Sequence, residues 1–330
     1  MMPHHDMPVI CHPDRGFLRV SGPDSTAFLQ SILTANIDTM AVGTCRASAL
    51  LTPQGRVLID MMVYRLAADH IVLQCDMARR DDLFTRLRRY RLRRPVDMAV
   101  DTTLILGHYF GETPPTAGPG TFVFTDPRDP LLGVHILADD HPALTRLADT
   151  NDTISRLDMA GAYIDRWHVR RIAAGVPEGP VDLVPERALM LEAGLDRLGA
   201  VDFDKGCYIG QEVTARTHYR GLVKRRLVPI KVHNNMPAVG SDITFDGRII
   251  GTSRSSAPLT GLDGSEDSLC LGLLKLEDIH LIDGHLIDGH VIDGASCDAG
   301  TMMVGGLPAR LAIPSWMRPL PNAAKSRSPA

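Results

Sequence analysis

The sequence predicts an α+β protein of more than one packed unit, followed by a small all-β domain. The chain has 330 residues, which is more than one small core organises. Up to about residue 222, short β-like runs are interspersed with segments whose apolar residues have helical spacing. From there on, short β-like runs alternate with Gly, Asn and Asp, which is typical of a small β-domain.

Runs of apolar and β-branched residues predict the strands of the first region: 16–20, a hairpin over 45–66, 70–75, 96–106, 121–124 and 131–137. The hairpin turn is expected at 52–55, where Pro and Gly occupy the positions that a β-turn favours. Helices are expected after the first strand, with Pro23 in the first turn, and over 77–92 and about 158–173. The segment 111–120 is rich in Gly and Pro and predicts a loop.

These patterns divide the chain into an N-terminal extension over 1–13, an α+β region over 14–222, a β-barrel over 223–317 and a disordered tail over 318–330. The barrel region contains His280-Leu-Ile-Asp-Gly, which recurs from His285 and, with Val291, from His290. Asp-Gly pairs favour turns, so we expect an extended loop or hairpin. The alternative is a metal site built by the three histidines. It is less favoured, because a five-residue period places successive histidines on opposite strand faces.

Charge and cysteine content exclude several classes of protein. The formal net charge is −4, which demands no polyanionic partner, and no apolar run approaches the ~20 residues of a membrane helix. The N-terminus lacks the apolar segment of a signal peptide. The cysteines contain no C-x-x-C pair, which argues against a zinc site or a cluster held by this chain alone: Cys11, Cys45, Cys75, Cys207, Cys270 and Cys297. Such sparse cysteine usage predicts a reducing cytoplasm as the location.

The strongest local signal is the sequence KGCYIGQE at 205–212. Gly206 and Gly210 free the backbone for a tight loop that a ligand can approach closely. Lys205 lies two residues from Cys207, and a nearby cation favours the thiolate, which is the nucleophilic and metal-binding form. A short helix is expected to begin at the end of this motif. The alternative is a buried loop cysteine whose neighbours only fill space.

A second signal is Asp60, in a strand over 56–64 whose two faces are both apolar. A carboxylate in a largely buried strand must find a hydrogen-bond donor, a cation or a ligand. The simpler explanation is an ion pair with one of the many arginines.

A third signal is the run RLRRYRLRR at 86–94, with six arginines in nine residues. Such a run suits phosphate binding, as in tRNA. However, Asp82 and Arg86 have the i,i+4 spacing of a helical ion pair, and the whole chain is acidic. We therefore favour a solvated helix face. The sequence contains no P-loop, no G-x-S-x-G and no H-E-x-x-H motif.

The motif at 205–212 resembles the signature of YgfZ-type folate-binding proteins, which support iron–sulfur cluster assembly and are related to the glycine-cleavage T protein (aminomethyltransferase). The resemblance covers most of residues 14–310, through GFLRVSGPDSTAFLQSILTANI, ASALLTPQGRVLIDMMVYRL, RWHVRRIAAGVPE and DFDKGCYIGQEVTARTHYRGLVKRRL. It implies a T-protein-like fold: two intertwined ferredoxin-like α+β units around a central pocket, with a C-terminal β-barrel. It also implies that the pocket binds tetrahydrofolate or a derivative.

The resemblance also implies site residues. Trp167 matches an aromatic folate contact of the family. A second such position falls near Arg15, whose guanidinium can stack on the ligand or reach its glutamate tail. The other expected cofactor contacts are Asp60, Lys205, Gly206, Tyr208, Gly210, Gln211 and Glu212. Cys207 has no counterpart in the T-protein enzymes, and the resemblance implies a functional thiol or transient cluster ligand there.

The T-protein enzymes carry two adjacent acidic residues in a hairpin of the type G-G-x-x-D-D. The matching stretch here is GRVLIDMM, in which Ile59 replaces the first acidic residue and Asp60 keeps the second. We therefore expect an accessory factor rather than a classical enzyme. Its expected partners are iron–sulfur assembly proteins and cluster-dependent enzymes, including tRNA-modifying ones, without stable nucleic-acid or membrane binding. The alternatives are a folate-dependent one-carbon enzyme with Asp60 as the acid/base group, and a tRNA-binding protein that uses 86–94.

Overall fold

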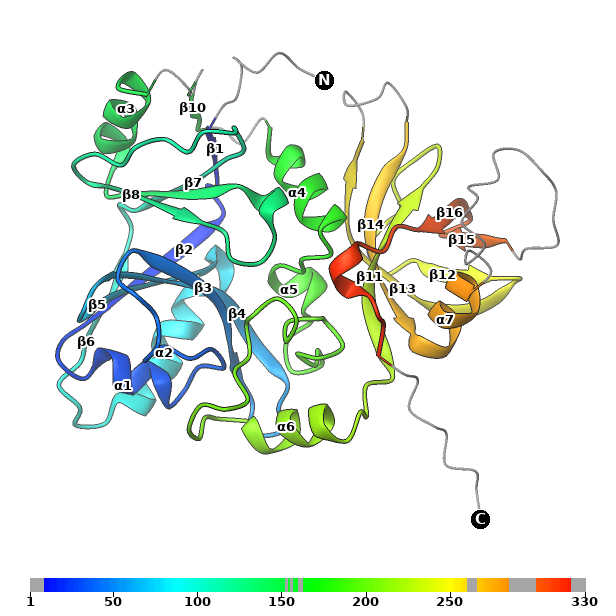
Figure 1. Ribbon diagram of the computed structural model, residues 1–330, viewed down its shortest axis with the longest axis horizontal. Coiled ribbons are helices and arrows are strands. Elements are labelled where there is room, and N and C mark those ends of the chain that lie inside the picture. The colour runs from blue at the N-terminus through cyan, green and yellow to red at the C-terminus, as the bar shows by residue number, and fades with distance from the viewer. Residues whose placement is uncertain are drawn as a thin grey trace.

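Figure 1 shows the computed structural model, which describes residues 9–151, 154, 157–159, 163–259, 266–284 and 301–321. Within these residues the chain forms two five-stranded sheets and one closed six-stranded barrel. The expected α+β class and the expected C-terminal barrel are both confirmed.

The first sheet has the strand order β3-β4-β5-β2-β6, and all its neighbours are antiparallel. Its strands are β2 (Arg15–Ser21), β3 (Thr44–Leu51), β4 (Val57–Ala67), β5 (His70–Asp76) and β6 (Asp97–Asp101). The β3–β4 turn lies where it was predicted, and the Gly55 N–H donates to the Thr52 carbonyl at 2.9 Å. The register of this hairpin places Asp60 opposite Ala49.

Two helices, α1 (Ser25–Gln30) and α2 (Arg80–Arg91), bury apolar side chains against this sheet. A 3₁₀ turn (Met77–Arg79) precedes α2, so the predicted helix over 77–92 is confirmed with a tighter first turn. The prediction for Pro23 is wrong. The helix begins two residues later, because Ser25 N–H donates to the Gly22 carbonyl and places Pro23 inside that turn.

The second sheet has the order β10-β1-β7-β9-β8. Its strands are β1 (Val9–Cys11), β7 (Ile105–Tyr109), β8 (Thr121–Thr125), β9 (Val134–Ala138) and β10 (Leu157–Asp158). Strand β1 lies between β10 and β7, although the next strand in the chain, β2, belongs to the first sheet. The two α+β units are therefore intertwined. The helix α3 (His141–Asp149) packs on β8 and β9, and a 3₁₀ turn (Pro130–Leu132) precedes β9.

Helix α4 (Ile164–Ala173) packs against the barrel strands β13 and β14. We expected this helix to begin near 158. It begins later, because Leu157 and Asp158 pair in parallel with Val9 and Ile10 of β1. The segment that follows contains the short helix α5 (Gly179–Asp182) and then α6 (Gln211–Tyr219), which confirms the helix expected after the KGCYIGQE motif.

The barrel consists of β11 (Arg225–Val232), β12 (Asp242–Phe245), β13 (Arg248–Pro258), β14 (Ser268–Lys275), β15 (Met302–Val304) and β16 (Leu307–Leu311). The first unit of the repeat is not a loop, because His280 lies in helix α7 (Leu276–Gly284), where Leu276, Ile279 and Ile282 bury one face. The other repeat units, with His285 and His290, lie outside the described residues.

After a 3₁₀ turn (Ser315–Met317), the chain reaches the residues expected to begin a disordered tail. The first of them are ordered instead: Leu320 is buried, and Arg318 pairs with Asp283 of α7. The other boundaries between the predicted parts stay predictions. No helix among the described residues is long and apolar enough to span a membrane.

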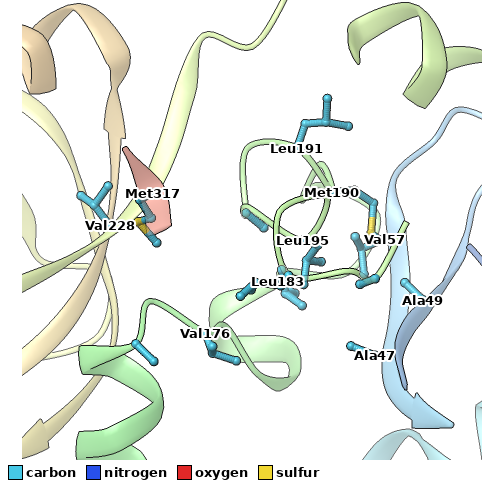
Figure 2. Close-up of a cluster of buried hydrophobic side chains, with 14 of the residues drawn as sticks. Ala47, Ala49, Val57, Val176, Leu183, Met190, Leu191, Leu195, Val228 and Met317 are labelled. Atoms are coloured by element: carbon cyan, nitrogen blue, oxygen red, sulfur yellow. The ribbon is translucent and has the colours of Figure 1, made fainter. Parts of the chain in front are cut away.

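The largest hydrophobic cluster contains residues of both five-stranded sheets and of the barrel, together with residues of the segment between α4 and α6. Figure 2 shows Leu183, Met190 and Leu195 of this segment between the β3–β4 strands and the barrel. These three side chains are buried, so this part of the segment packs inside the core. It fixes the position of the residues around 178 relative to β4.

Candidate functional site

A network of charged side chains lies at the start of strand β2. Arg15 is buried, and its Nη2 lies 2.6 Å from Oε2 of Glu178. The same carboxylate oxygen accepts a hydrogen bond from Trp167 Nε1 at 3.1 Å, and Arg171 Nε lies 3.5 Å away. Although burial opposes ionisation, the Arg15 and Arg171 guanidinium groups hold the pKa of Glu178 well below its usual range. Glu178 is therefore a charged hydrogen-bond acceptor at neutral pH.

Asp60 lies beside this network on β4, which is largely buried as predicted. Its Oδ2 accepts a hydrogen bond from the Gly179 N–H at 3.0 Å, so its direct partner is a backbone amide rather than an arginine. Burial raises the pKa of Asp60, and the charge of Glu178 adds to that effect, while the hydrogen bond from Gly179 opposes it. Asp60 therefore holds a proton more readily than Glu178 does.

Two cavities meet at Arg15 and Glu178. The inner one, about 20 Å³, is also lined by Asp60, Gln74 and Arg128, and its size suits about one water molecule. The outer one is an open cleft of about 400 Å³ between the first sheet and the barrel, and its lining includes Arg171. The Arg15–Glu178 pair therefore separates a small polar chamber from a cleft of small-molecule size.

Arg171 connects this site to the barrel. Its Nη1 lies 2.7 Å from Asp182 Oδ2, and its Nη2 donates to Ser255 Oγ of β13 at 2.9 Å. Asp182 also accepts hydrogen bonds from the backbone N–H groups of Glu178 and Ser255. One buried arginine and one buried carboxylate thus fix the wall of the outer cleft.

A larger cavity, about 530 Å³, lies on the other side of this wall, and Arg56, Arg225 and Arg254 line part of it. It contains none of the predicted site residues. Glu192 in its lining already pairs with Arg225 at 3.1 Å. We therefore place the candidate site at the two cavities that share Arg15 and Glu178.

Trp167 is fully buried and lines neither of those two cavities. Its ring stacks on His108 with a centroid distance of 3.8 Å, and its indole N–H is committed to Glu178. In this structure Trp167 therefore orients the Glu178 carboxylate. Its predicted contact with folate stays a prediction.

The loop that carries Cys207 lies at a different place. Cys207 is exposed, whereas the other four cysteines that the structure describes are buried: Cys11, Cys45, Cys75 and Cys270. The loop packs on the β3–β4 turn, since a Cβ added to Gly210 would lie 2.5 Å from the Thr52 carbonyl oxygen. Cys207 lines neither cavity. The structure does not bring the thiol and the charged network together.

Lys205 also differs from its prediction. We expected its charge to act on Cys207, but the Lys205 side chain is buried, and its Nζ donates to the carbonyls of Leu33 and Ala35 at 2.7 and 2.6 Å. Burial lowers the pKa of Lys205 to about 8. Lys205 therefore anchors the loop to the segment after α1. Asp202 supports the same loop by accepting hydrogen bonds from the N–H groups of Asp204 and Lys205.

The remaining motif residues have separate positions around this loop. Tyr208 is buried, and its ring lies 5.2 Å from Lys205 Nζ. Gln211 Nε2 approaches the Lys205 carbonyl at 3.4 Å, and exposed Glu212 pairs with Arg216 one turn along α6. A Cβ added to Gly206 would meet nothing within 4 Å. None of the motif residues lines the two cavities.

The arginine run on α2 forms the solvated face that we favoured. Arg88, Arg89, Arg93 and Arg94 are exposed, and Arg86 Nε lies 2.8 Å from Asp82 Oδ1. Only Leu83 and Leu87 of this helix are buried.

Sequence reasoning missed three residues of the site: Glu178, Arg171 and Asp182. The one available signal was the pair of acidic residues in PEGPVD, directly after a predicted helix end. Their roles depend on contacts with β2 and β13, which are distant in the sequence.

The chain has a T-protein-like fold of two α+β units and a closed C-terminal barrel. The GCVT N-terminal domain model matches residues 15–106, and the CAF17 C-terminal beta-barrel domain model matches 224–319. Among solved structures, the glycine cleavage system aminomethyltransferase T from Bartonella henselae superposes with a TM-score of 0.66 at 17% identity. The match covers 83% of this chain and 79% of that one, which confirms the expected T-protein-like fold.

The curated relatives identify the family. The human iron–sulfur cluster assembly factor IBA57 is 33% identical over 278 residues, which cover 75% of this chain and 74% of that protein. The mouse protein is 32% identical with the same coverage. The Pyricularia oryzae homologue is also 32% identical, but the chain spans only 57% of its length. The chain belongs to the family of the IBA57 iron–sulfur cluster assembly factors, which confirms the family predicted from the KGCYIGQE motif.

This comparison contradicts the cytoplasmic location expected from cysteine usage. The human, mouse and Pyricularia oryzae relatives are all named as mitochondrial proteins. Sparse cysteines distinguish reducing from oxidising compartments, but they do not tell one reducing compartment from another.

Proposed function

We propose that this protein is a folate-binding accessory factor for iron–sulfur cluster assembly, and that Cys207 is its functional thiol. The observation that carries the proposal is the exposure of Cys207 on a loop that Lys205 and Gly210 hold in place. Cluster ligation ordinarily takes four protein ligands, so Cys207 acts in a shared contact to which a partner or small thiol adds ligands. The names of the IBA57 relatives support this role.

The test is recovery of cluster-dependent enzymes in a strain that lacks the protein. Cys207→Ser keeps the size of the side chain but is a much weaker metal ligand, so we expect it to fold normally and to fail in recovery. Cys45→Ala is the control, because it removes a buried thiol and should preserve recovery. Full recovery by Cys207→Ser at native expression would refute a functional thiol. The clients in this proposal include tRNA-modifying enzymes, which the same strain can report separately.

The proposed folate site is the outer cleft with the Arg15–Glu178 pair at its base. A pterin is flat and carries hydrogen-bond donors along one edge, which suit the ionised Glu178 carboxylate. Arg15 and Arg171 lie 2.6 and 3.5 Å from Glu178 Oε2 and keep that carboxylate ionised, so the ring edge binds here and the glutamate tail extends away from the pair. The inner cavity holds about one water, so the ring occupies the outer cleft unless the pair separates.

Calorimetry with tetrahydrofolate tests this site. Glu178→Gln keeps the shape of the side chain and removes its charge, so we expect binding to weaken by about tenfold or more. The control is Glu212→Gln, at an exposed carboxylate outside both cavities. Equal binding by the wild type and Glu178→Gln would show that tetrahydrofolate does not bind in this cleft. The sequence predicts folate contacts from motif residues 205–212, which include Glu212. Weaker binding by Glu212→Gln would support those contacts.

A one-carbon enzyme is the second candidate, because burial raises the pKa of Asp60 above its ordinary value, which favours a carboxyl group that exchanges a proton. Ile59 at the neighbouring position argues against it, since the acidic pair of the T-protein enzymes is incomplete. Release of formaldehyde equivalents from an aminomethyl donor, abolished in Asp60→Asn, would establish the enzyme. No release by folded protein that binds tetrahydrofolate would favour the accessory factor.

A further inference from the structure

We propose that His108, Asp126 and His135 form a binding site for one divalent transition-metal ion. One ring nitrogen from each histidine and a carboxylate oxygen of Asp126 all lie within 4.8 Å of one another, and the three residues are buried. Two imidazoles and one carboxylate are a common ligand set for zinc and for non-haem iron. None of the three residues lines the cavities of the proposed folate site, so this site is separate from it.

The register of the second sheet builds this cluster. His108 of β7 is the direct cross-strand partner of His135 of β9, and cross-strand neighbours place their side chains on the same face. Asp126 follows β8, the next strand, and its backbone N–H donates to the Gly133 carbonyl at 3.0 Å. The three ligands therefore lie on, or directly after, three adjacent strands of one sheet, which gives the rigid support that a metal site requires.

Each of the three side chains has an outer hydrogen-bond partner. Nδ1 of His135 lies 2.7 Å from Tyr64 Oη, and Nδ1 of His108 lies 2.7 Å from Nε2 of His12. Arg128 Nη2 lies 2.7 Å from Asp126 Oδ2. Metal-binding histidines almost always use the second ring nitrogen in this way, which fixes the tautomer and the ring orientation.

One ligand atom of the cluster is unpaired: Nε2 of His108 is buried and has no hydrogen-bond partner among the residues that the structure describes. When Nδ1–H of His108 donates to His12, Nε2 carries a lone pair, which is the form that binds a metal. A buried nitrogen without a partner is uncommon in proteins, and an ion satisfies it.

Metal binding changes one hydrogen bond. Nε2 of His135 now lies 2.7 Å from Asp126 Oδ2, and an ion that uses both atoms replaces this contact. A His135 ring that binds an ion through Nε2 carries its proton on Nδ1, which lies 2.7 Å from Tyr64 Oη. Arg128 offsets the charge of Asp126, which disfavours hard cations such as Mg²⁺ and favours ions that bind imidazole strongly.

The test uses the full-length protein and Co²⁺, whose visible spectrum reports its ligands. We expect one Co²⁺ per chain with nitrogen and oxygen ligands, and X-ray absorption of that sample should show imidazole and no sulfur. The same stoichiometry is expected for Cys207→Ser and for a variant with His280, His285 and His290 replaced by Asn. These two variants remove the exposed thiol and the His-rich repeat as alternative sites.

His108→Asn and His135→Asn should each weaken Co²⁺ binding by about tenfold or more, whereas His141→Asn, at the start of α3, should not. Unchanged affinity in folded His108→Asn and His135→Asn would overturn the proposal. So would no Co²⁺ binding by the folded wild type, or sulfur ligation in its X-ray absorption spectrum. The last two measurements need no substitution, so they decide the question even if the core variants do not fold.

Discussion

The two glycines of the KGCYIGQE motif are predicted to differ sharply in their tolerance of a side chain. Gly210 has a φ of +81°, in the left-handed region, and its backbone packs against the β3–β4 turn. Gly206 lies four residues earlier in the same loop, with open space around its Cα. Gly210→Ala and Gly206→Ala are therefore a matched pair within one motif.

The cost of Gly210→Ala has two main contributions. A left-handed backbone costs an L-residue about 1–2 kcal/mol. The added Cβ would lie 2.5 Å from the Thr52 carbonyl oxygen and 3.0 Å from the Leu51 Cβ, and overpacking of this kind costs about 1–3 kcal/mol. The lower entropy of the unfolded alanine chain returns about 0.4–1 kcal/mol. We expect Gly210→Ala to lower the free energy of unfolding by about 1–5 kcal/mol, and Gly206→Ala to change it by less than about 0.5 kcal/mol.

Urea denaturation of the two variants and the wild type measures these differences. Amide hydrogen exchange of 205–212 shows whether the loss in Gly210→Ala is local to the loop. The reasoning would be refuted by equal stability of Gly210→Ala and the wild type, or by equal losses in the two variants. Recovery of cluster-dependent enzymes adds a functional readout. If stable Gly206→Ala fails in recovery, the open space at Gly206 serves the approach of a partner.

Three other measurements test the structure. Trp167→Phe removes the hydrogen bond to Glu178 but keeps an aromatic ring, so tetrahydrofolate should bind about tenfold more weakly in calorimetry; unchanged affinity would exclude an orienting role. The pKa of Lys205 is lowered to about 8 in the folded protein and has its ordinary value of 10.5 in the unfolded chain. Between these two pH values the unfolded state therefore binds more protons than the folded state. The free energy of unfolding of the wild type should therefore rise with pH across that window relative to Lys205→Met, and parallel pH profiles would contradict the lowered pKa. Removal of one five-residue repeat, 285–289, should leave the melting temperature nearly unchanged, because closure entropy changes slowly with loop length; a large loss would show that the repeat is part of the core.

The sequence by itself determined the elements whose signals are local. The 52–55 turn followed from Pro53 and Gly55 at the second and fourth positions of a β-turn, and the barrel followed from short β-like runs after residue 222. The KGCYIGQE motif identified the family, and the exposed arginine face of α2 followed from its i,i+4 pair with Asp82. These features depend on residues within a few positions of one another, so one sequence contains the information.

Only the tertiary structure decided how distant charges meet. Lys205 and Cys207 are two residues apart, yet Lys205 turns inward, because the buried carbonyls of Leu33 and Ala35 bind its ammonium group. The site around Glu178 depends on Arg15, which is 163 positions away in the chain, as the contact between their side chains shows. Strand register likewise places His108 opposite His135. Local propensities do not encode such pairings, because they arise from how the two sheets and the barrel close around a shared core.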